Sequence, residues 1–176
     1  VDNGGTLLCL DINNLEPVWM YDVGDDTDST IVIEEEEDGV FIYTANEVDK
    51  RCANGKASKA DANIRKFNAL TGELIWQRDY TCYYRSGING GVLGTPLLGK
   101  DDIADRIIFP VCFTGSQMDG KLVALDKKTG EEIWVRQLDN YSWSSPVAIK
   151  GDDGKTYALL CGYDGFMRLF DPMTGE

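Results

Sequence analysis

Short apolar runs recur along the whole chain, separated by segments rich in Gly, Asp, Asn and Ser. This run length is typical of β-strands, whereas a helix needs a longer segment with apolar residues at i, i+3 and i+4. No segment of useful length shows that helical spacing. The pattern therefore predicts an all-β fold, with one strand around Trp19 and others near residues 7–10, 31–33, 40–43, 64–67, 74–77, 97–98, 106–109, 122–125, 133–135, 147–149, 156–161 and 167–170.

Four of these runs end in Asp or Asn, and in three of them a Trp follows eight residues later. The pairs are Asp11 with Trp19, Asn68 with Trp76, and Asp126 with Trp134, and Asp171 begins a fourth copy. Three of the four tryptophans thus share one offset, which coincidence explains poorly. We interpret the pattern as an internal repeat, the feature that most strongly restricts the fold.

Between the Asp or Asn and the Trp, each copy carries the features of a tight hairpin turn. The side chain of Asp or Asn accepts hydrogen bonds from backbone N–H groups of the turn, and Gly supplies a positive φ. Gly72, Gly130 and Gly175, each preceded by Thr, occupy the glycine position. The first copy has Asn14-Leu15 instead, so its turn is expected to differ.

Two further apolar runs lie between successive hairpins, which gives four strands in each repeat. The Asp or Asn positions are 57, 58 and 45 residues apart. The shortest spacing suits a four-stranded propeller blade, and the longer ones indicate insertions. Residues 122–125 are apolar on both faces, as in a sheet stacked between two others. A partial β-propeller is therefore predicted, with a solenoid or a sandwich as the alternatives.

The predicted single domain, residues 1–176, is an open arc of about three to four antiparallel blades with thirteen strands. Residues 1–23 supply the last two strands of one blade, residues 28–80 and 92–138 each form a full blade, and residues 142–176 supply three strands of a further blade. We expect the chain to be a fragment. Its open sheet edges would be covered by the remaining blades of the same protein.

The third copy reads Ala124-x-Asp126-x-x-Thr129-Gly130-x-x-x-Trp134 and resembles the tryptophan-docking motif of the pyrroloquinoline quinone (PQQ) repeat family. The second copy departs from the motif, with Lys66 and Asn68 in place of Ala and Asp. The resemblance covers nearly the whole chain and implies that each Trp packs against the neighbouring blade. It assigns this structural role to Asp11, Trp19, Asn68, Gly72, Trp76, Ala124, Asp126, Thr129, Gly130, Trp134, Asp171 and Gly175.

The resemblance is specific for the fold and not for a cofactor. The family includes quinoprotein dehydrogenases, which bind PQQ and Ca²⁺, and propellers that bind no quinone, such as outer-membrane assembly lipoproteins and sensor portions of membrane kinases. The dehydrogenases often carry an adjacent-cysteine disulfide over the quinone. Here the cysteines are isolated from one another, at Cys9, Cys52, Cys82, Cys112 and Cys161. No acidic trio matches a dehydrogenase calcium site.

These departures favour a non-catalytic binding or scaffold propeller with no cofactor and no catalytic or metal-binding residue. An extracytoplasmic location follows from the habit of the family. Two alternatives stay open: the propeller portion of a PQQ-dependent dehydrogenase whose active site lies in further blades, with PQQ and Ca²⁺ as its cofactors, or the sensor propeller of a larger signalling protein.

The charge of the chain narrows the class of partner. The formal net charge is -13, from 30 acidic and 17 basic side chains, and there is no His. Such a charge argues against nucleic acid and anionic lipid as partners. The lack of His excludes Ser-His-Asp and Cys-His catalysis within this chain. No apolar run is long enough to insert directly into a membrane. A protein or a small-molecule ligand is the predicted partner.

Acidic residues gather in turns between the first and second strands of the blades, at 34–38, 101–105 and 152–153. Residues 24–28, Gly-Asp-Asp-Thr-Asp, superficially resemble a calcium loop but lack the spacing of an EF-hand. We interpret all of these carboxylates as solvated turn residues.

Two long insertions, at 46–62 and 81–91, both fall on the opposite rim of the predicted propeller. Long loops on a rigid scaffold commonly carry binding residues, so Tyr83, Tyr84, Arg85 and Asn89 are candidates. The alternative is a solvated decoration in which both tyrosines cover blade edges.

Cys52 and Cys82 lie in these two insertions, so the predicted wiring places both on one rim. A disulfide between them is a further candidate feature, and two free loop thiols are the alternative. The other three cysteines fall in predicted strands and are interpreted as small core residues.

Overall fold

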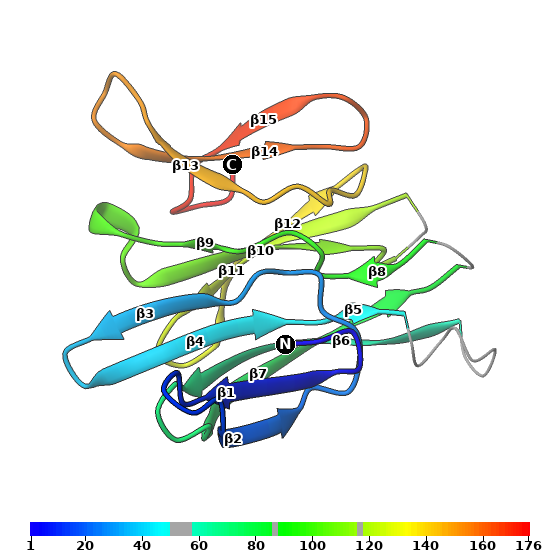
Figure 1. Cartoon of the computed structure of the whole chain (residues 1–176). Helices are drawn as coiled ribbons and strands as arrows, with labels where there is room; N and C mark the ends of the chain where they lie inside the picture. Colours follow the sequence, from blue (N-terminus) through cyan, green and yellow to red (C-terminus); the bar gives the residue numbers. More distant parts are fainter. Residues whose placement is uncertain (50–57, 86–87, 116–117) are drawn as a thin grey trace.

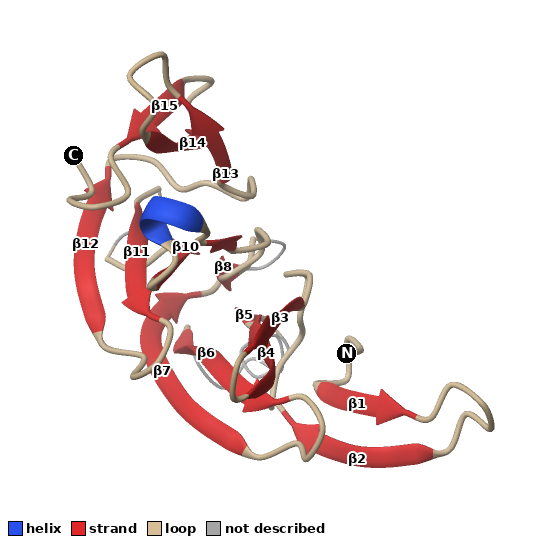
Figure 2. Ribbon diagram, turned by 90° about the vertical axis from the view of Figure 1, so that its left-hand side faces the viewer, coloured by secondary structure: helices blue, strands red, loops and turns tan. Residues whose placement is uncertain are grey.

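The computed structural model describes residues 1–49, 58–85, 88–115 and 118–176. Within this part of the chain, four antiparallel sheets follow one another along an open arc (Figure 1, Figure 2). The predicted all-β, partial propeller is confirmed. Figure 2 shows the last strand of successive blades, β2, β7 and β12, along the convex outer side. No helix among the described residues is long and apolar enough to cross a membrane.

The sheets form in chain order. The first sheet pairs β1 (Thr6–Leu10) with β2 (Pro17–Asp22), and the second has the order β3 (Val32–Glu36), β4 (Gly39–Ala45), β6 (Lys59–Asn68) and β7 (Leu74–Tyr83). The third has the order β12 (Glu132–Leu138), β11 (Gly120–Asp126), β10 (Arg106–Cys112), β8 (Gly90–Gly91) and β5 (Glu47–Val48), with β9 (Leu97–Leu98) paired to β10. The last contains β13 (Val147–Lys150), β14 (Thr156–Cys161) and β15 (Met167–Phe170).

The repeat residues form the hairpin turn of each sheet. Oδ1 of Asp126 accepts hydrogen bonds from the backbone N–H groups of Lys128 and Thr129, at 2.9 and 2.7 Å. The N–H group of Gly130 donates to the carbonyl oxygen of Asp126 at 2.8 Å, and its φ is 71°. Glycine tolerates this left-handed conformation because it has no Cβ. The second and fourth copies repeat the glycine bond and a positive glycine φ.

Each repeat Trp packs on the turn of the following blade. The Nε1–H group of Trp76 donates to the carbonyl oxygen of Lys127 at 3.0 Å, and the ring lies so close to Gly130 that a Cβ there would be 2.6 Å from Cδ2. Trp19 and Trp134 make equivalent bonds and lie equally close to the glycines of their neighbouring turns. Trp76 is 8% exposed, whereas Trp19 and Trp134 are half-buried. One contact thus joins successive sheets.

The first turn was expected to differ, and that expectation is wrong. Leu15 occupies the glycine position with φ of 60°, and its N–H group donates to the carbonyl oxygen of Asp11 at 2.7 Å. The backbone therefore adopts the same turn, and the leucine carries the steric strain that glycine avoids.

The core lies between successive sheets. The largest apolar cluster joins the second and third sheets and contains Tyr43, Ile64, Trp76 and Phe109. Smaller clusters join the first sheet to the second around Leu7 and Phe67, and the third to the last around Leu122 and Leu160. The outermost sheets leave large apolar side chains exposed, among them Met20 and Met167. This distribution fits blades that lie side by side in an unclosed arc.

The structure corrects the predicted insertions. The described residues form fifteen strands rather than thirteen, because β5 (Glu47–Val48) and β8 (Gly90–Gly91) are additional. The insertion at 46–62 is partly strand, since β6 begins at Lys59, and residues 50–57 lie outside the described residues. The insertion at 81–91 is also partly strand, since β7 continues to Tyr83.

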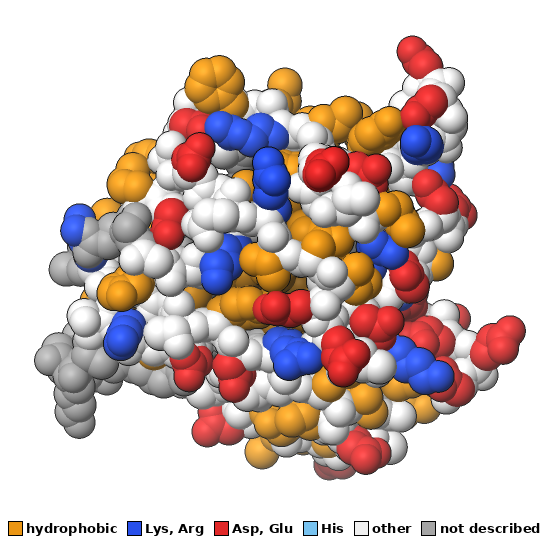
Figure 3. Space-filling view, turned by 180° about the vertical axis from the view of Figure 1, so that it is seen from behind, with side chains coloured by type: hydrophobic (Ala, Val, Ile, Leu, Met, Phe, Trp, Pro, Cys, Tyr) orange, Lys and Arg blue, Asp and Glu red, His pale blue; other side chains and the backbone are white. Residues whose placement is uncertain are grey.

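The acidic turns are not simply solvated. Oε1 of Glu36 lies 2.8 Å from Nζ of Lys66, and Glu34 forms an ion pair with Lys127. Both lysines are buried, and the hydroxyl of Tyr43 donates to both glutamates. Figure 3 shows Asp and Glu side chains gathered on the side away from the grey segments. Two glutamates of this acidic surface therefore neutralise lysines buried between blades, which keeps those charges paired.

Candidate functional site

The antiparallel blades place their connections on two opposite rims. The turn rim carries the β1–β2, β6–β7 and β11–β12 hairpin turns together with the β3–β4, β9–β10 and β13–β14 turns. The loop rim carries the β4–β6, β10–β11 and β14–β15 connections and the segments that lead from blade to blade. The predicted candidates Tyr83, Tyr84, Arg85 and Asn89 belong to the loop rim, and the repeat turns belong to the turn rim.

Two glycines tie the second and third sheets together on the loop rim. Gly91 pairs with Glu47 in β5 and with Cys112 in β10, so β8 joins the third sheet to β5, the short strand that follows β4 of the second sheet along the chain. A Cβ on Gly91 would lie 2.8 Å from Cα of Glu47, and a Cβ on Gly90 would lie 2.2 Å from the carbonyl oxygen of Tyr83. Only glycine fits such close backbone approaches. The bridge fixes the position of the neighbouring aromatic segment.

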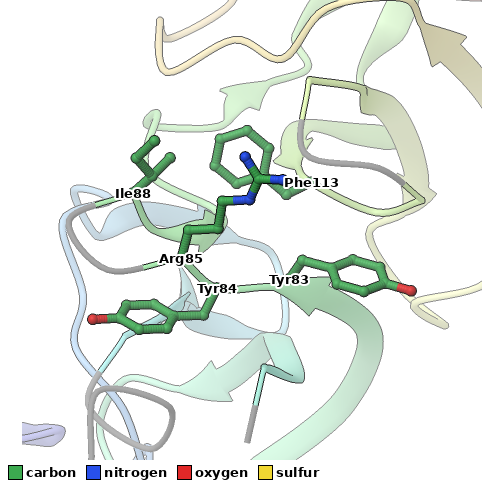
Figure 4. Close-up of a pocket in the computed structure, with 5 residues that line it drawn as sticks. All are labelled: Tyr83, Tyr84, Arg85, Ile88 and Phe113. Atoms are coloured by element: carbon green, nitrogen blue, oxygen red, sulfur yellow. The ribbon is translucent and has the colours of Figure 1, made fainter. Parts of the chain in front are cut away.

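Tyr83, Tyr84 and Arg85 do not form one stacking surface. The two tyrosine rings point in opposite directions, and the Arg85 side chain extends toward Phe113 (Figure 4). Arg85 and Ile88 exchange two backbone hydrogen bonds, at 3.1 and 2.8 Å. These five residues line a shallow hollow with no room for even a water-sized molecule. Ligand pockets for small molecules usually measure about 300–1,000 Å³, so this hollow is not a small-molecule site.

A row of aromatic side chains continues along the loop rim from this hollow. Phe113 packs on Tyr141 with ring centroids 4.5 Å apart, and Tyr141 stacks on Tyr163 at 4.6 Å. Trp143 lies 5.1 Å from Tyr141 and 6.1 Å from Tyr163. The sequence analysis missed this row because its members come from three separate connections. The sequence offered one signal for this row. Phe113 directly follows β10, Tyr141 and Trp143 lie between β12 and β13, and Tyr163 lies just after β14.

Three carboxylates of the loop rim could hold a metal ion. Single oxygens of Asp26, Asp28 and Glu47 all lie within 4.8 Å of one another. Glu47 is 1% exposed, and Nδ2 of Asn89 donates to its Oε2 at 3.1 Å. Burial, together with the neighbouring acidic groups, raises the pKa of Glu47 to about 8. Oxygen ligands of this kind suit Ca²⁺. Glu47 therefore lies beside both Asp26 and Asp28 of the calcium-like segment 24–28 and the candidate residue Asn89.

The cysteines lie in different surroundings. Cys82 is in β7 rather than in a loop, it is fully buried, and its Sγ lies 3.3 Å from the carbonyl oxygen of Tyr80. Burial raises the pKa of Cys82 to about 12. Cys112 is also buried, whereas Cys161 is exposed. Cys52 lies outside the described residues, so the Cys52–Cys82 disulfide stays a prediction.

The stacked four-stranded sheets and the repeated Trp-on-turn contact define a propeller built from PQQ-type repeats. The family model described as outer membrane protein assembly factor BamB matches residues 1–147 and also residues 60–175. The chain belongs to this family.

Individual relatives include both an assembly factor and a quinoprotein dehydrogenase. The chain is 24% identical over 153 residues to the outer membrane protein assembly factor BamB of Kangiella koreensis, a match to 66% of this chain and 37% of that protein. It is 30% identical over 78 residues to the quinoprotein ethanol dehydrogenase of Pseudomonas aeruginosa, a match to 43% of this chain and 12% of the enzyme.

A solved structure agrees with the fold. The crystal structure of BamB from Moraxella catarrhalis superimposes with a TM-score of 0.56 at 19% identity, over 99% of this chain and 43% of that one. The chain therefore spans less than half the length of these relatives.

Proposed function

We propose that this chain is a non-catalytic propeller domain whose loop rim binds a protein partner. The proposal rests on the surface shape of that rim and on the aromatic side chains along it. The hollow beside the Tyr83–Arg85 segment has no room for a water-sized molecule, while aromatic side chains continue beyond it in a row. A broad aromatic surface with only small hollows is typical of protein–protein interfaces, where buried Trp, Tyr and Arg residues dominate the binding affinity.

The family supports a protein partner and an extracytoplasmic location. The matching family model and the Kangiella koreensis relative are named as an outer membrane protein assembly factor, and this name supports a protein partner outside the cytoplasm. The net charge of -13 is also compatible with a protein partner and unsuited to nucleic acid.

A second candidate function is supported by the Asp26–Asp28–Glu47 group. The local likeness to a quinoprotein ethanol dehydrogenase makes Ca²⁺ and PQQ the implied groups. The oxygen donors of this cluster fit Ca²⁺, which would be held by the three carboxylates. PQQ fits less well, because the cysteines are isolated in sequence and the hollow at Phe113 is too small for a tricyclic quinone. The dehydrogenase reading therefore requires an active site formed by further blades.

Site-specific photo-crosslinking in living cells tests the proposal. A photoreactive phenylalanine analogue replaces Tyr84 on the loop rim or, as the matched control, the exposed Leu70 on the turn rim. We expect one discrete protein adduct from the loop rim and none from Leu70, with the adduct identified by mass spectrometry. Adducts from Leu70 alone would contradict the proposal. Stoichiometric PQQ uptake in the presence of Ca²⁺, recorded by quinone absorbance, would favour the dehydrogenase instead.

A further inference from the structure

The aromatic row ends in three rings that leave an open face. Tyr141 is 4% exposed and forms the floor, whereas Trp143 and Tyr163 are 42% and 62% exposed. Tyr163 stacks on Tyr141 at an interplanar angle of 21°, and Trp143 meets Tyr163 at 62°. Two exposed rings inclined to each other over a third present negatively polarised π faces in more than one direction. This arrangement, the Tyr141–Trp143–Tyr163 group, suits a cation better than a flat ring does.

The backbone holds these rings in place. The N–H group of Tyr163 donates to the carbonyl oxygen of Tyr141 at 3.0 Å, and the N–H group of Tyr141 donates to the carbonyl oxygen of Met118 at 2.9 Å. The hydroxyls of Ser142 and Ser144 both donate to the carbonyl oxygen of Cys161, at 2.6 and 2.8 Å. These bonds join the segments before β13 and after β14, so little conformational entropy remains to be lost on binding.

Carboxylates flank the same rings. Asp139 lies two residues before Tyr141, and Asp164 directly follows Tyr163. Asp164 holds Arg168 through both of its oxygens, and the guanidinium lies 5.5 Å from the ring centroid of Phe166. The chain therefore already places one of its own cations between a carboxylate and an aromatic ring beside the group. The hydrogen bonds to Asp164 raise the pKa of Arg168, and the negative charge of Asp139 adds a smaller effect in the same direction, so Asp139 also acts on this part of the surface.

We propose that the Tyr141–Trp143–Tyr163 group binds a lysine or arginine side chain presented by a basic segment of the partner protein. The inference rests on the proposed function of the loop rim and adds the chemistry of the partner. The cation would contact the faces of Trp143 and Tyr163, and the charge of Asp139 would attract the basic segment around it, since Asp164 is already paired with Arg168. The strongly acidic chain as a whole favours such a partner over an acidic one.

Peptide binding to the purified chain tests the inference by isothermal titration calorimetry. The probes are four short Gly/Ser peptides of equal length that carry spaced arginine, lysine, citrulline or glutamate residues. Citrulline keeps the shape of arginine and removes its charge. We expect binding of the arginine and lysine peptides, weaker with rising NaCl, and at least about tenfold weaker binding of the citrulline peptide. The glutamate peptide is expected not to bind.

Variants locate the site. Trp143→Ala should weaken the arginine peptide about five- to tenfold, Trp143→Phe should weaken it only about two- to threefold, and Asp139→Asn should reduce both the affinity and its salt dependence. The control, Ile12→Ala, changes an exposed apolar residue of the turn rim and should have no effect. Far-ultraviolet circular dichroism checks that each variant is folded.

Equal binding of the arginine and citrulline peptides, or an unchanged affinity in folded Trp143→Ala, would overturn the inference. The proposed function can fail separately. A loop-rim protein adduct from the Tyr84 position together with no basic-peptide binding would remove only the inferred chemistry, whereas adducts from Leu70 alone would remove the loop rim as the interface.

Discussion

Two glycines with the same backbone conformation separate backbone strain from the Trp-on-turn contact. Gly130 has φ of 71° and Gly154 has φ of 79°, but a Cβ on Gly130 would meet Trp76 while a Cβ on Gly154 would meet nothing within 4 Å. The substitutions Gly130→Ala and Gly154→Ala therefore impose a similar left-handed strain. Only the first also displaces an indole ring. The difference between the two losses of unfolding free energy therefore measures the Trp-on-turn contact that joins the second blade to the third.

The magnitude follows from the distances. An L-residue in the left-handed region costs about 1–2 kcal/mol, and both variants carry this cost. At Gly130 the ring of Trp76 must also retreat from the new Cβ, which would stand 2.6 Å from Cδ2. That movement breaks the Trp76–Lys127 hydrogen bond, worth ~1 kcal/mol, and overpacks the interface at a cost of ~1–3 kcal/mol. We expect a loss of about 1–2 kcal/mol for Gly154→Ala and about 3–6 kcal/mol for Gly130→Ala.

Urea denaturation, followed by far-ultraviolet circular dichroism and by tryptophan fluorescence, measures both losses. Equal slopes of the unfolding free energy against urea would show that the variants change stability and not the surface exposed on unfolding. If Gly130→Ala is no more destabilising than Gly154→Ala, the ring contact contributes nothing to stability. The Trp-on-turn contact would then be only a geometric feature of the repeat.

Three further predictions use the same unfolding assay. Trp76→Ala should lose about 3–5 kcal/mol through the cavity and the lost hydrogen bond, against less than ~1 kcal/mol for the exposed Trp143→Ala; similar losses would contradict the assigned burial. Leu15→Gly should gain about 0.5–1 kcal/mol by relieving the positive φ, and a net loss would show that the leucine side chain stabilises the turn. The pKa of Glu47 is about 8 against an ordinary 4.5, so the folded state binds this proton more tightly than the unfolded state does. The resulting stabilisation is complete below pH 4.5 and is lost as the pH rises through about 8. Glu47→Gln should therefore flatten the fall in unfolding free energy across that range, and an equally steep fall in the variant would contradict the assignment.

The blades could be predicted from sequence because the repeat is local. The distance from Asp126 to Trp134 is short, and the residues between them fold into a turn whose hydrogen bonds all lie within a few residues. The register of β11 and β12 then places Ala124 opposite Trp134. Local spacing therefore determined the element type and the order of the strands. The mistaken turn at Leu15 came from treating glycine as required, although a leucine can adopt the same φ at a cost.

The candidate site was less predictable because its residues meet only after the blades have stacked. Phe113, Tyr141 and Tyr163 are widely separated in sequence and follow no common spacing. The same is true of Glu47, which reaches Asp26 and Asp28 from another segment. The additional length of β6 and β7 was not predicted for a different reason. The ends of β6 and β7 pair as far as Lys59 and Tyr83, and the buried Ala62, Tyr80 and Cys82 still belong to the core there. These residues alternate with polar ones, so no continuous apolar run marks this part of the two strands in the sequence.

The two rims carry different physical constraints, and this separation explains why the aromatic row can be exposed. On the turn rim, Trp134 bonds to the carbonyl oxygen of Pro172 at 2.8 Å, and Arg106 bonds to the same oxygen at 2.9 Å. These contacts join the third blade to the last without any contribution from the loop rim. Because stability is supplied at the turns, Trp143 and Tyr163 need not be buried to hold the blades together. Exposed aromatic surface that stability does not require is the kind of surface that a binding function uses.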